Sequence, residues 1–197
     1  EMGSGYLFIL RTTKHGRART ALAKLAAVML FNVGIVFLFT ASTWLVYGWR
    51  YGYSSAENAL QTLKAYLRSP YVVTIGQYFW ITAGLRTLAG AVFSAVLCAV
   101  SVFTYNYVLV YASGLGLFGL NYWFYTMRVN RADHILKNMN LIAAAEGTPL
   151  FARLRLTNLF GQPADFLSTL IGAYALIVLA ASALCVAKFA HSAGGVQ

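Results

Sequence analysis

Charged side chains, and acidic ones above all, are scarce in this sequence. Of its 197 residues only 10% are charged, whereas an ordinary soluble domain carries about a quarter. Because 59% of the residues are hydrophobic, this scarcity excludes water as the solvent for most of the surface. The 15 Lys and Arg against 5 Asp and Glu would indicate a nucleic-acid partner in a soluble protein. Here the basic residues flank apolar runs, so we expect membrane lipid as the partner and no nucleic acid.

The sequence also lacks the residue clusters on which most enzymatic chemistry depends. Its two cysteines, Cys98 and Cys185, lie in apolar runs without a CxxC pair, so we expect buried free thiols. It has no phosphate-binding loop, no metal-ligand spacing among its 3 His and no nucleophile elbow. Gly114, Gly116 and Gly119 spell a dinucleotide-binding motif, but no βαβ pattern surrounds them, so they predict close helix packing. We therefore expect no enzyme activity, no catalytic or metal site and no cofactor in this chain.

Long runs without any charge are what the sequence has in abundance. Three of them cover residues 25–49, 87–127 and 166–187, with 25, 41 and 22 residues. A bilayer core needs about 20 helical residues, so the first and third runs each predict one span. The middle run would be about 60 Å long as a helix, so it predicts two spans with a turn near 105–107. The predicted fold is an all-α, polytopic transmembrane helical bundle with short interfacial amphipathic helices.

The segments between these runs carry patterns typical of short helices at a membrane surface. A capping-box signature, Ser54 with Glu57, precedes apolar residues at helical spacing. Similar patterns predict helical pieces at 131–145 and 150–160. A fifth crossing through residues 71–85 is a second possibility for the topology.

Basic and aromatic residues predict the orientation of the chain. The strongest positive cluster precedes the first run and should face the cytoplasm; it consists of Arg11, Lys14, Arg17, Arg19 and Lys24. Tyr and Trp gather at the opposite ends of the spans, which should be the external interface. The expected organisation is therefore 1–24 a cytoplasmic basic segment, for which a coupling role is inferred below from a resemblance, 25–49 a transmembrane helix, 50–80 an external loop with an amphipathic helix, 81–127 two transmembrane helices, 128–165 an external amphipathic segment, 166–187 a transmembrane helix and 188–197 a cytoplasmic tail.

Arg86 is the ionisable residue nearest to the body of the predicted membrane region. Such a residue is a candidate for a transport pathway, because a charge inside the membrane is retained where it lines a cavity or pairs within a bundle. The alternative is that the second span begins near Ile81 and that the long side chain of Arg86 reaches the interface. The sequence leaves both interpretations open.

The most specific pattern lies in the first 24 residues. They contain an acidic residue, a glycine, an apolar stretch, a Thr-Thr-Lys-His-Gly-Arg turn and an Ala-Lys pair at the entry to a membrane helix. This order resembles the cytoplasmic segment of bacterial ATP-binding-cassette permeases of the type-two exporter class. The resemblance implies ATPase-coupling roles for Glu1, Gly5, Arg11, Thr12, Thr13, Lys14, Gly16, Arg17 and Lys24.

Two further segments, 136–141 and 158–163, are similar to the external region before the last helix of these permeases. The resemblance thus implies a fragment that covers the third to sixth membrane helices. It also implies three partners: membrane lipid, an ATP-binding-cassette ATPase subunit that holds ATP and Mg, and a second permease half or a homodimer. The expected location is the bacterial inner (plasma) membrane, as a multi-pass protein.

Three functions are compatible with these features. The first is the permease component of an ATP-driven exporter. The second is a structural or accessory membrane subunit without transport activity, in which the basic segment is an ordinary cytoplasmic anchor. The third, a membrane enzyme acting on lipids, has the least support, because no catalytic cluster lies within the predicted spans.

Overall fold

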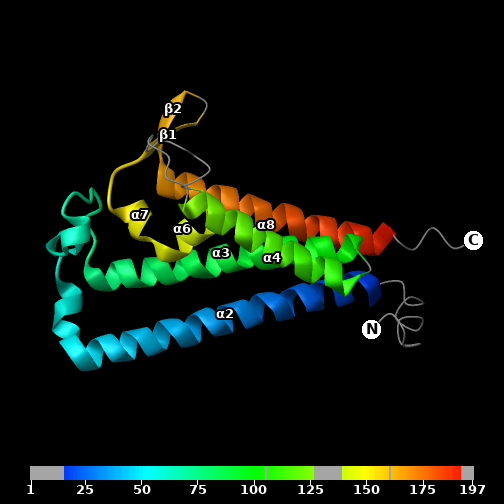
Figure 1. The fold of residues 1–197 in the computed structure, drawn as a ribbon, viewed down its shortest axis with the longest axis horizontal. Coiled ribbons are helices and arrows are strands. Elements are labelled where there is room, and N and C mark those ends of the chain that lie inside the picture. Colours follow the sequence, from blue (N-terminus) through cyan, green and yellow to red (C-terminus); the bar gives the residue numbers. More distant parts are fainter. Residues whose placement is uncertain (1–15, 105, 127–138, 160, 192–197) are drawn as a thin grey trace, which may run out of the picture.

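Four long helices run lengthwise through the computed structural model, which describes residues 16–104, 106–126, 139–159 and 161–191 (Figure 1). These helices are α2 (Gly16–Tyr51), α3 (Ile75–Phe103), α4 (Tyr107–Thr126) and α8 (Phe166–His191). Helices α2 and α4 run in one direction and α3 and α8 in the other. We call the end where α2 begins and α8 ends the terminal end, and the opposite end the loop end.

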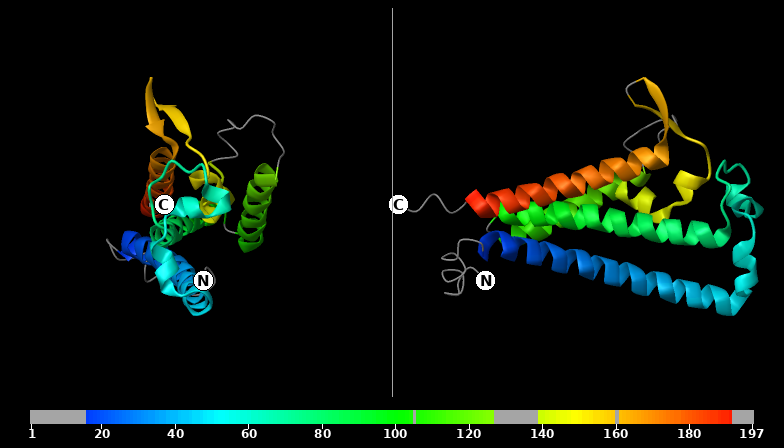
Figure 2. Two further views of the ribbon diagram at one scale, coloured as in Figure 1. Left: turned by 90° about the vertical axis from the view of Figure 1, so that its left-hand side faces the viewer. Right: turned by 180° about the vertical axis from the view of Figure 1, so that it is seen from behind.

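Three of the described helices are long and apolar enough to cross a membrane, namely Leu22–Tyr51, Ile75–Phe103 and Phe166–Lys188. The protein therefore has the composition of a membrane-spanning helical protein. Helix α4, with 20 residues, is not among the three, since polar and aromatic residues dominate its second half. A fourth crossing through α4 stays a prediction. In Figure 2, seen along the bundle, α4 stands to one side of α2, α3 and α8.

Helix α3 begins earlier than the sequence predicted. Thr74 caps its N-terminus by accepting a hydrogen bond from the backbone of Gln77, whose side chain accepts one from Thr74 in return. From there α3 runs unbroken to Phe103, and α4 begins at Tyr107, so the chain turns where the uncharged run predicted. Because residues 75–85 belong to this same helix, a separate fifth crossing through 71–85 is wrong.

The connection between α2 and α3 is not the single amphipathic α-helix that was predicted. It consists of three short 3₁₀ turns, η1 (Tyr53–Glu57), η2 (Leu60–Thr62) and η3 (Lys64–Tyr66). The capping box of Ser54 and Glu57 does not form, because both residues lie inside η1, whose N-cap is Gly52. Backbone hydrogen bonds from Leu60 to Val73 and from Ile75 to Asn58 pair this segment with the chain before α3, and Asn58 and Ala59 are extended, which interrupts a regular helix.

The connection between α4 and α8 contains both short helices and strands. Helices α6 (Leu141–Glu146) and α7 (Thr148–Phe151) are followed by an antiparallel hairpin of β1 (Leu156–Leu159) and β2 (Gln162–Asp165). The hairpin corrects the all-α prediction and replaces the helical piece expected at 150–160, because its backbone groups pair across the two strands. Of the helix expected at 131–145, residues 131–138 lie outside the described residues, and the described part begins only at Leu141.

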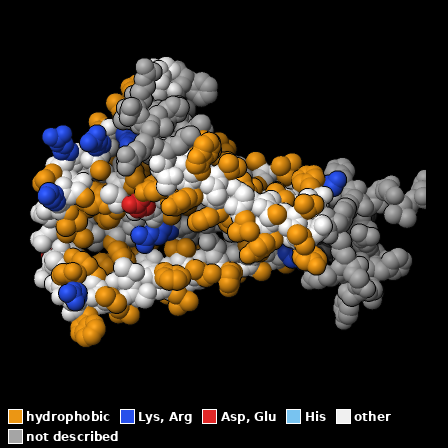
Figure 3. Space-filling model, in the orientation of Figure 1, with side chains coloured by type: hydrophobic (Ala, Val, Ile, Leu, Met, Phe, Trp, Pro, Cys, Tyr) orange, Lys and Arg blue, Asp and Glu red, His pale blue; other side chains and the backbone are white. Residues whose placement is uncertain are grey.

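The buried core lies where α6 and α7 pack against α3 and α8. Its members are Leu60, Tyr66, Leu85, Ala89, Val92, Ala144, Leu150, Phe151, Phe166, Leu170 and Tyr174. Helices α2 and α4 instead expose large apolar side chains, and Phe39 is 72% exposed. Figure 3 shows such side chains over most of the visible face. Apolar side chains on the outside are expected where lipid is the solvent.

Candidate functional site

The break between α6 and α7 is the centre of the candidate site. Gly147 ends α6 and precedes α7 with φ of 77°, a conformation that costs a residue with a Cβ atom about 1–2 kcal/mol. Its Cα also lies close to α3, because a Cβ on Gly147 would stand 2.5 Å from Cγ2 of Thr82. Glycine is therefore required here for two reasons, the backbone angle and the close approach to α3.

Arg86 on α3 holds the end of α6. Its Nε donates a hydrogen bond of 2.8 Å to the carbonyl oxygen of Ala145, in the last turn of α6. A positive charge at this position stabilises the free carbonyl groups and the negative end of the helix dipole. Since α3 begins at Ile75, Arg86 lies about 17 Å inside it, and the premise of an interfacial Arg86, a helix starting near Ile81, is wrong.

A chain of hydroxyl groups ties α7 to α3 and η3. The Tyr66 and Tyr78 hydroxyls are 2.7 Å apart, and Tyr66 also donates to Oγ1 of Thr148 at 3.1 Å. Phe151 packs against the Tyr78 ring edge to face, with centroids 5.1 Å apart. These contacts hold the first turn of α7 against the N-terminal end of α3.

Asparagine side chains tie α6 to α4. Asn140 caps α6 by accepting from the backbone of Ile142, and its Nδ2 donates to the Asn121 carbonyl oxygen at 2.6 Å. Asn121 in turn accepts from the backbone of Leu141 at 3.2 Å. Within a membrane, interrupted backbone is tolerated only where protein or a cavity satisfies its polar groups. The side chains of α3 and α4 supply those partners for α6.

One further bond connects this segment to α8, and another joins the chain before α3 to the end of β2. The hydroxyl of Tyr174 donates to the carbonyl oxygen of Met139 at 2.8 Å, and that of Tyr71 donates to Oδ1 of Asp165 at 2.8 Å. Burial, reinforced by the hydrogen bond to Asp165, raises the pKa of the Tyr71 hydroxyl well above its ordinary value. Tyr71 therefore remains a hydrogen-bond donor throughout the neutral pH range.

Only three of the predicted coupling residues are described, and they lie far from this site. Glu1, Gly5, Arg11, Thr12, Thr13 and Lys14 are outside the described residues. Gly16 begins α2, and Arg17 and Lys24 lie in its first turns. They are at the terminal end, whereas the break at Gly147 lies towards the loop end, so the structure does not bring them together with Arg86 (Figure 1).

One polar contact between the membrane helices was missed from the sequence. Asn32 on α2 donates from Nδ2 to the carbonyl oxygen of Thr87 on α3 at 3.0 Å. Gly90 leaves the space for it, because a Cβ there would stand 2.1 Å from Oδ1 of Asn32. The available signal was an asparagine within an uncharged run, since polar residues in membrane helices commonly bond to a neighbouring helix.

Within the described ranges, no group of three or more His, Cys, Asp or Glu side chains could hold a metal ion. Both cysteines are free, Cys185 buried and Cys98 half-buried. No protein-family model, curated protein or solved structure matches this chain.

Proposed function

We propose that this chain is the membrane-spanning permease component of an ATP-driven exporter, in which a partner ATPase hydrolyses ATP and the helices move the substrate. The observation that carries the proposal is the continuity of α2. This helix of 36 residues runs without a break from Gly16, in the predicted coupling segment, to Tyr51 at the loop end. At about 54 Å it is longer than a bilayer core, so one rigid element connects the two ends of the bundle.

Contacts along α2 provide a route from the coupling segment to the candidate site. Asn32 bonds to the Thr87 carbonyl on α3, and the adjacent Arg86 bonds to Ala145 on α6. A displacement of α2 by the ATPase would therefore reach α6 and the break at Gly147 through two hydrogen bonds on neighbouring residues of α3. Interrupted helices within a bundle are the elements that transporters use near their substrate sites.

The remaining parts of the proposal follow from the resemblance of the first 24 residues to ATP-binding-cassette permeases. ATP and Mg would be bound by the ATPase subunit, and this chain would hold no cofactor of its own. The membrane would be the bacterial inner membrane, and the protein would work with a second permease half or a second copy of itself. The exposed apolar faces of α2 and α4 leave room for lipid and for such a partner.

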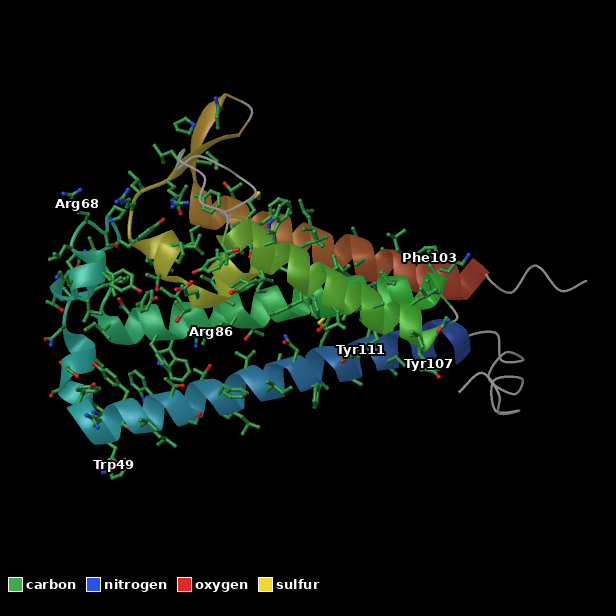
Figure 4. The ribbon with its side chains drawn as sticks, in the orientation of Figure 1. Trp49, Arg68, Arg86, Phe103, Tyr107 and Tyr111 are labelled. Carbon is green, nitrogen blue, oxygen red and sulfur yellow. The ribbon has the colours of Figure 1, made fainter. Side chains whose placement is uncertain are left out.

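The decisive experiment is purification of the full-length gene product from its native host, with and without the substitution Arg17→Glu. We expect an ATPase subunit with a phosphate-binding loop to co-purify with the native protein, and Arg17→Glu to reduce that association and ATP-dependent transport at least tenfold. The control is Arg68→Glu, because Arg68 is exposed at the loop end (Figure 4). Full ATPase association and transport in the Arg17→Glu protein would refute the coupling role.

The second candidate is a structural or accessory subunit of a larger membrane complex. The contact between Arg86 and Ala145 is compatible with it, because a charge that fixes one helix end stabilises a static scaffold without any movement. The same purification separates the two candidates. A stable complex that contains no ATPase, and shows no ATP-dependent transport, would support the accessory subunit and exclude the exporter.

A further inference from the structure

An apolar groove of about 780 Å³ lies between α3 and α4, towards the terminal end. Phe93 and Leu97 of α3 and its C-cap Thr104 are among the residues that line it, and Tyr111, Leu115 and Phe118 are among those of α4. The described lining contains no charged side chain and carries only a few hydroxyl groups. The groove therefore offers an environment suited to a hydrocarbon chain rather than to a soluble solute.

Arg86 lies on α3 beyond the loop-end limit of this groove and is not one of its lining residues. Phe93, Leu97 and Thr104 follow Arg86 on α3 at spacings that place all four on one face of the helix. Measured along the axis of α3, Arg86 lies about 10 Å nearer to the loop end than Phe93. Figure 4 shows Arg86, Tyr111 and Tyr107 along the same side of the bundle, between α2 and the helices α3 and α4.

Arg86 forms no ion pair within the described part of the chain, although an acidic group lies near it on the same face. Its hydrogen bond uses Nε and a neutral carbonyl group, and no described carboxylate forms an ion pair with it. Glu146, the residue after Ala145, accepts a hydrogen bond from Tyr125. Arg86 is half-buried, and Figure 3 shows a basic group in the middle of the face, at the place that Figure 4 labels Arg86, with an acidic group beside it and apolar side chains around the two.

A guanidinium group at this depth is costly without an anion, and its planar fork fits a phosphate group well. We propose that Arg86 and the α3–α4 groove form one site for an amphiphilic anion. Its phosphate group binds the Nη atoms of Arg86, and its hydrocarbon chain lies in the groove. A positive charge that forms no described ion pair, on the same helix face as an apolar groove, is what selects this chemistry over a neutral lipid, a cation or a polar solute.

Direct binding tests the site without any ATPase. The full-length protein is placed in nanodiscs of neutral phosphatidylcholine, and binding of radiolabelled hexadecyl phosphate is measured at equilibrium. We expect saturable binding, at least tenfold tighter than that of hexadecylphosphocholine or the hexadecyltrimethylammonium cation. Equal binding of the three probes would overturn the proposal, because it would show partition into lipid or a groove without charge preference.

Two substitutions separate the charge from the groove. Arg86→Gln keeps a donor for the Ala145 carbonyl but removes the charge, and it should weaken hexadecyl phosphate binding at least tenfold, whereas Arg86→Lys should retain part of it. Leu115→Trp fills the groove from an exposed position and should weaken all long-chain probes. The matched control is Arg68→Gln, which removes an exposed charge at the loop end. Native binding in both Arg86→Gln and Leu115→Trp would refute the site.

The assignment of the amphiphilic anion as the transported substrate rests on the proposed function. The binding site and the exporter function can nevertheless be refuted separately. Failure of hexadecyl phosphate to bind, with ATP-dependent transport intact, would refute this substrate class and leave the exporter. Binding that depends on Arg86, in a protein that recruits no ATPase, would establish the site and refute the exporter.

Discussion

At the scale of single residues, Gly147 is the position whose identity the structure constrains most strongly. It combines a positive φ with contact against Thr82 and Tyr78 on α3, so the interruption between α6 and α7 is built into one residue. Arg86 acts one turn further along α3, where it fixes the end of α6. The backbone angle and close approach of Gly147, together with the hydrogen bond of Arg86, set the position of α6 and α7 on α3.

We predict that Gly147→Ala destabilises the folded protein by about 2 kcal/mol or more, because the new methyl group would overlap Thr82 in a strained backbone conformation. Thermal unfolding of the purified protein in detergent measures the effect. Gly172→Ala is the matched control, since a Cβ at Gly172 in α8 meets nothing within 4 Å. A Gly147→Ala protein as stable as the Gly172→Ala protein would contradict the geometry described for the break.

At the scale of elements, α2 packs against α3 and α8, and the contact between Asn32 and α3 lies near the middle of α2. The asparagine needs Gly90 opposite it, because even a methyl group at residue 90 would occupy the space of the Asn32 amide. We call Asn32 and Gly90 the matched pair, because the Asn32 side chain fills the space that the absent side chain of Gly90 leaves. Such a pair holds two membrane helices at a fixed register as well as at a short distance.

The matched pair predicts non-additive substitutions. Asn32→Ala should cost only about 0.6 kcal/mol, the average for hydrogen bonds between membrane helices. Gly90→Ala should cost about 1–3 kcal/mol through overpacking against Asn32. In the double variant the overlap disappears, so we expect a coupling energy of about 1 kcal/mol or more in the unfolding free energy. Additive losses would show that the two residues do not oppose each other.

The long helices could be predicted from the sequence, and the elements between them could not. Runs such as 25–49 and 166–187 are recognisable because each satisfies its own backbone hydrogen bonds and needs only an apolar surround. The break at Gly147 depends on Thr82 and Arg86, which are distant in the chain. The hairpin at 156–165 is a local pairing, but its last residue, Asp165, accepts a hydrogen bond from the distant Tyr71. Arg86 was predictable as a candidate because a lone charge in an apolar run is conspicuous, but its bond to α6 was not.

At the scale of the whole molecule, the described helices place both chain ends at the terminal end and all the short elements towards the loop end (Figure 1). This arrangement requires an even number of passes along the bundle. Helices α2, α3 and α8 have the composition of membrane spans, so the count depends on α4. If α4 also crosses, the loop end is a single external surface formed by η1–η3, α7 and the hairpin.

Cysteine labelling of the intact cell decides whether α4 crosses. In a background in which Cys98 and Cys185 are replaced by serine, single cysteines are placed at Ser54, Arg153 and Lys188, all of which are exposed. We expect a membrane-impermeant maleimide to label positions 54 and 153 on intact cells, and position 188 only after the membrane is opened.

Residues 54 and 153 are separated along the chain by α3 and α4. If α3 crosses and α4 does not, Arg153 lies on the opposite side of the membrane from Ser54, and only one of the two is labelled on intact cells. That result would exclude the four-span topology, and it would place the break at Gly147 and the hairpin on the same side as α2's first turn. Joint labelling of 54 and 153 requires that α4 return the chain across the bilayer, despite its polar second half.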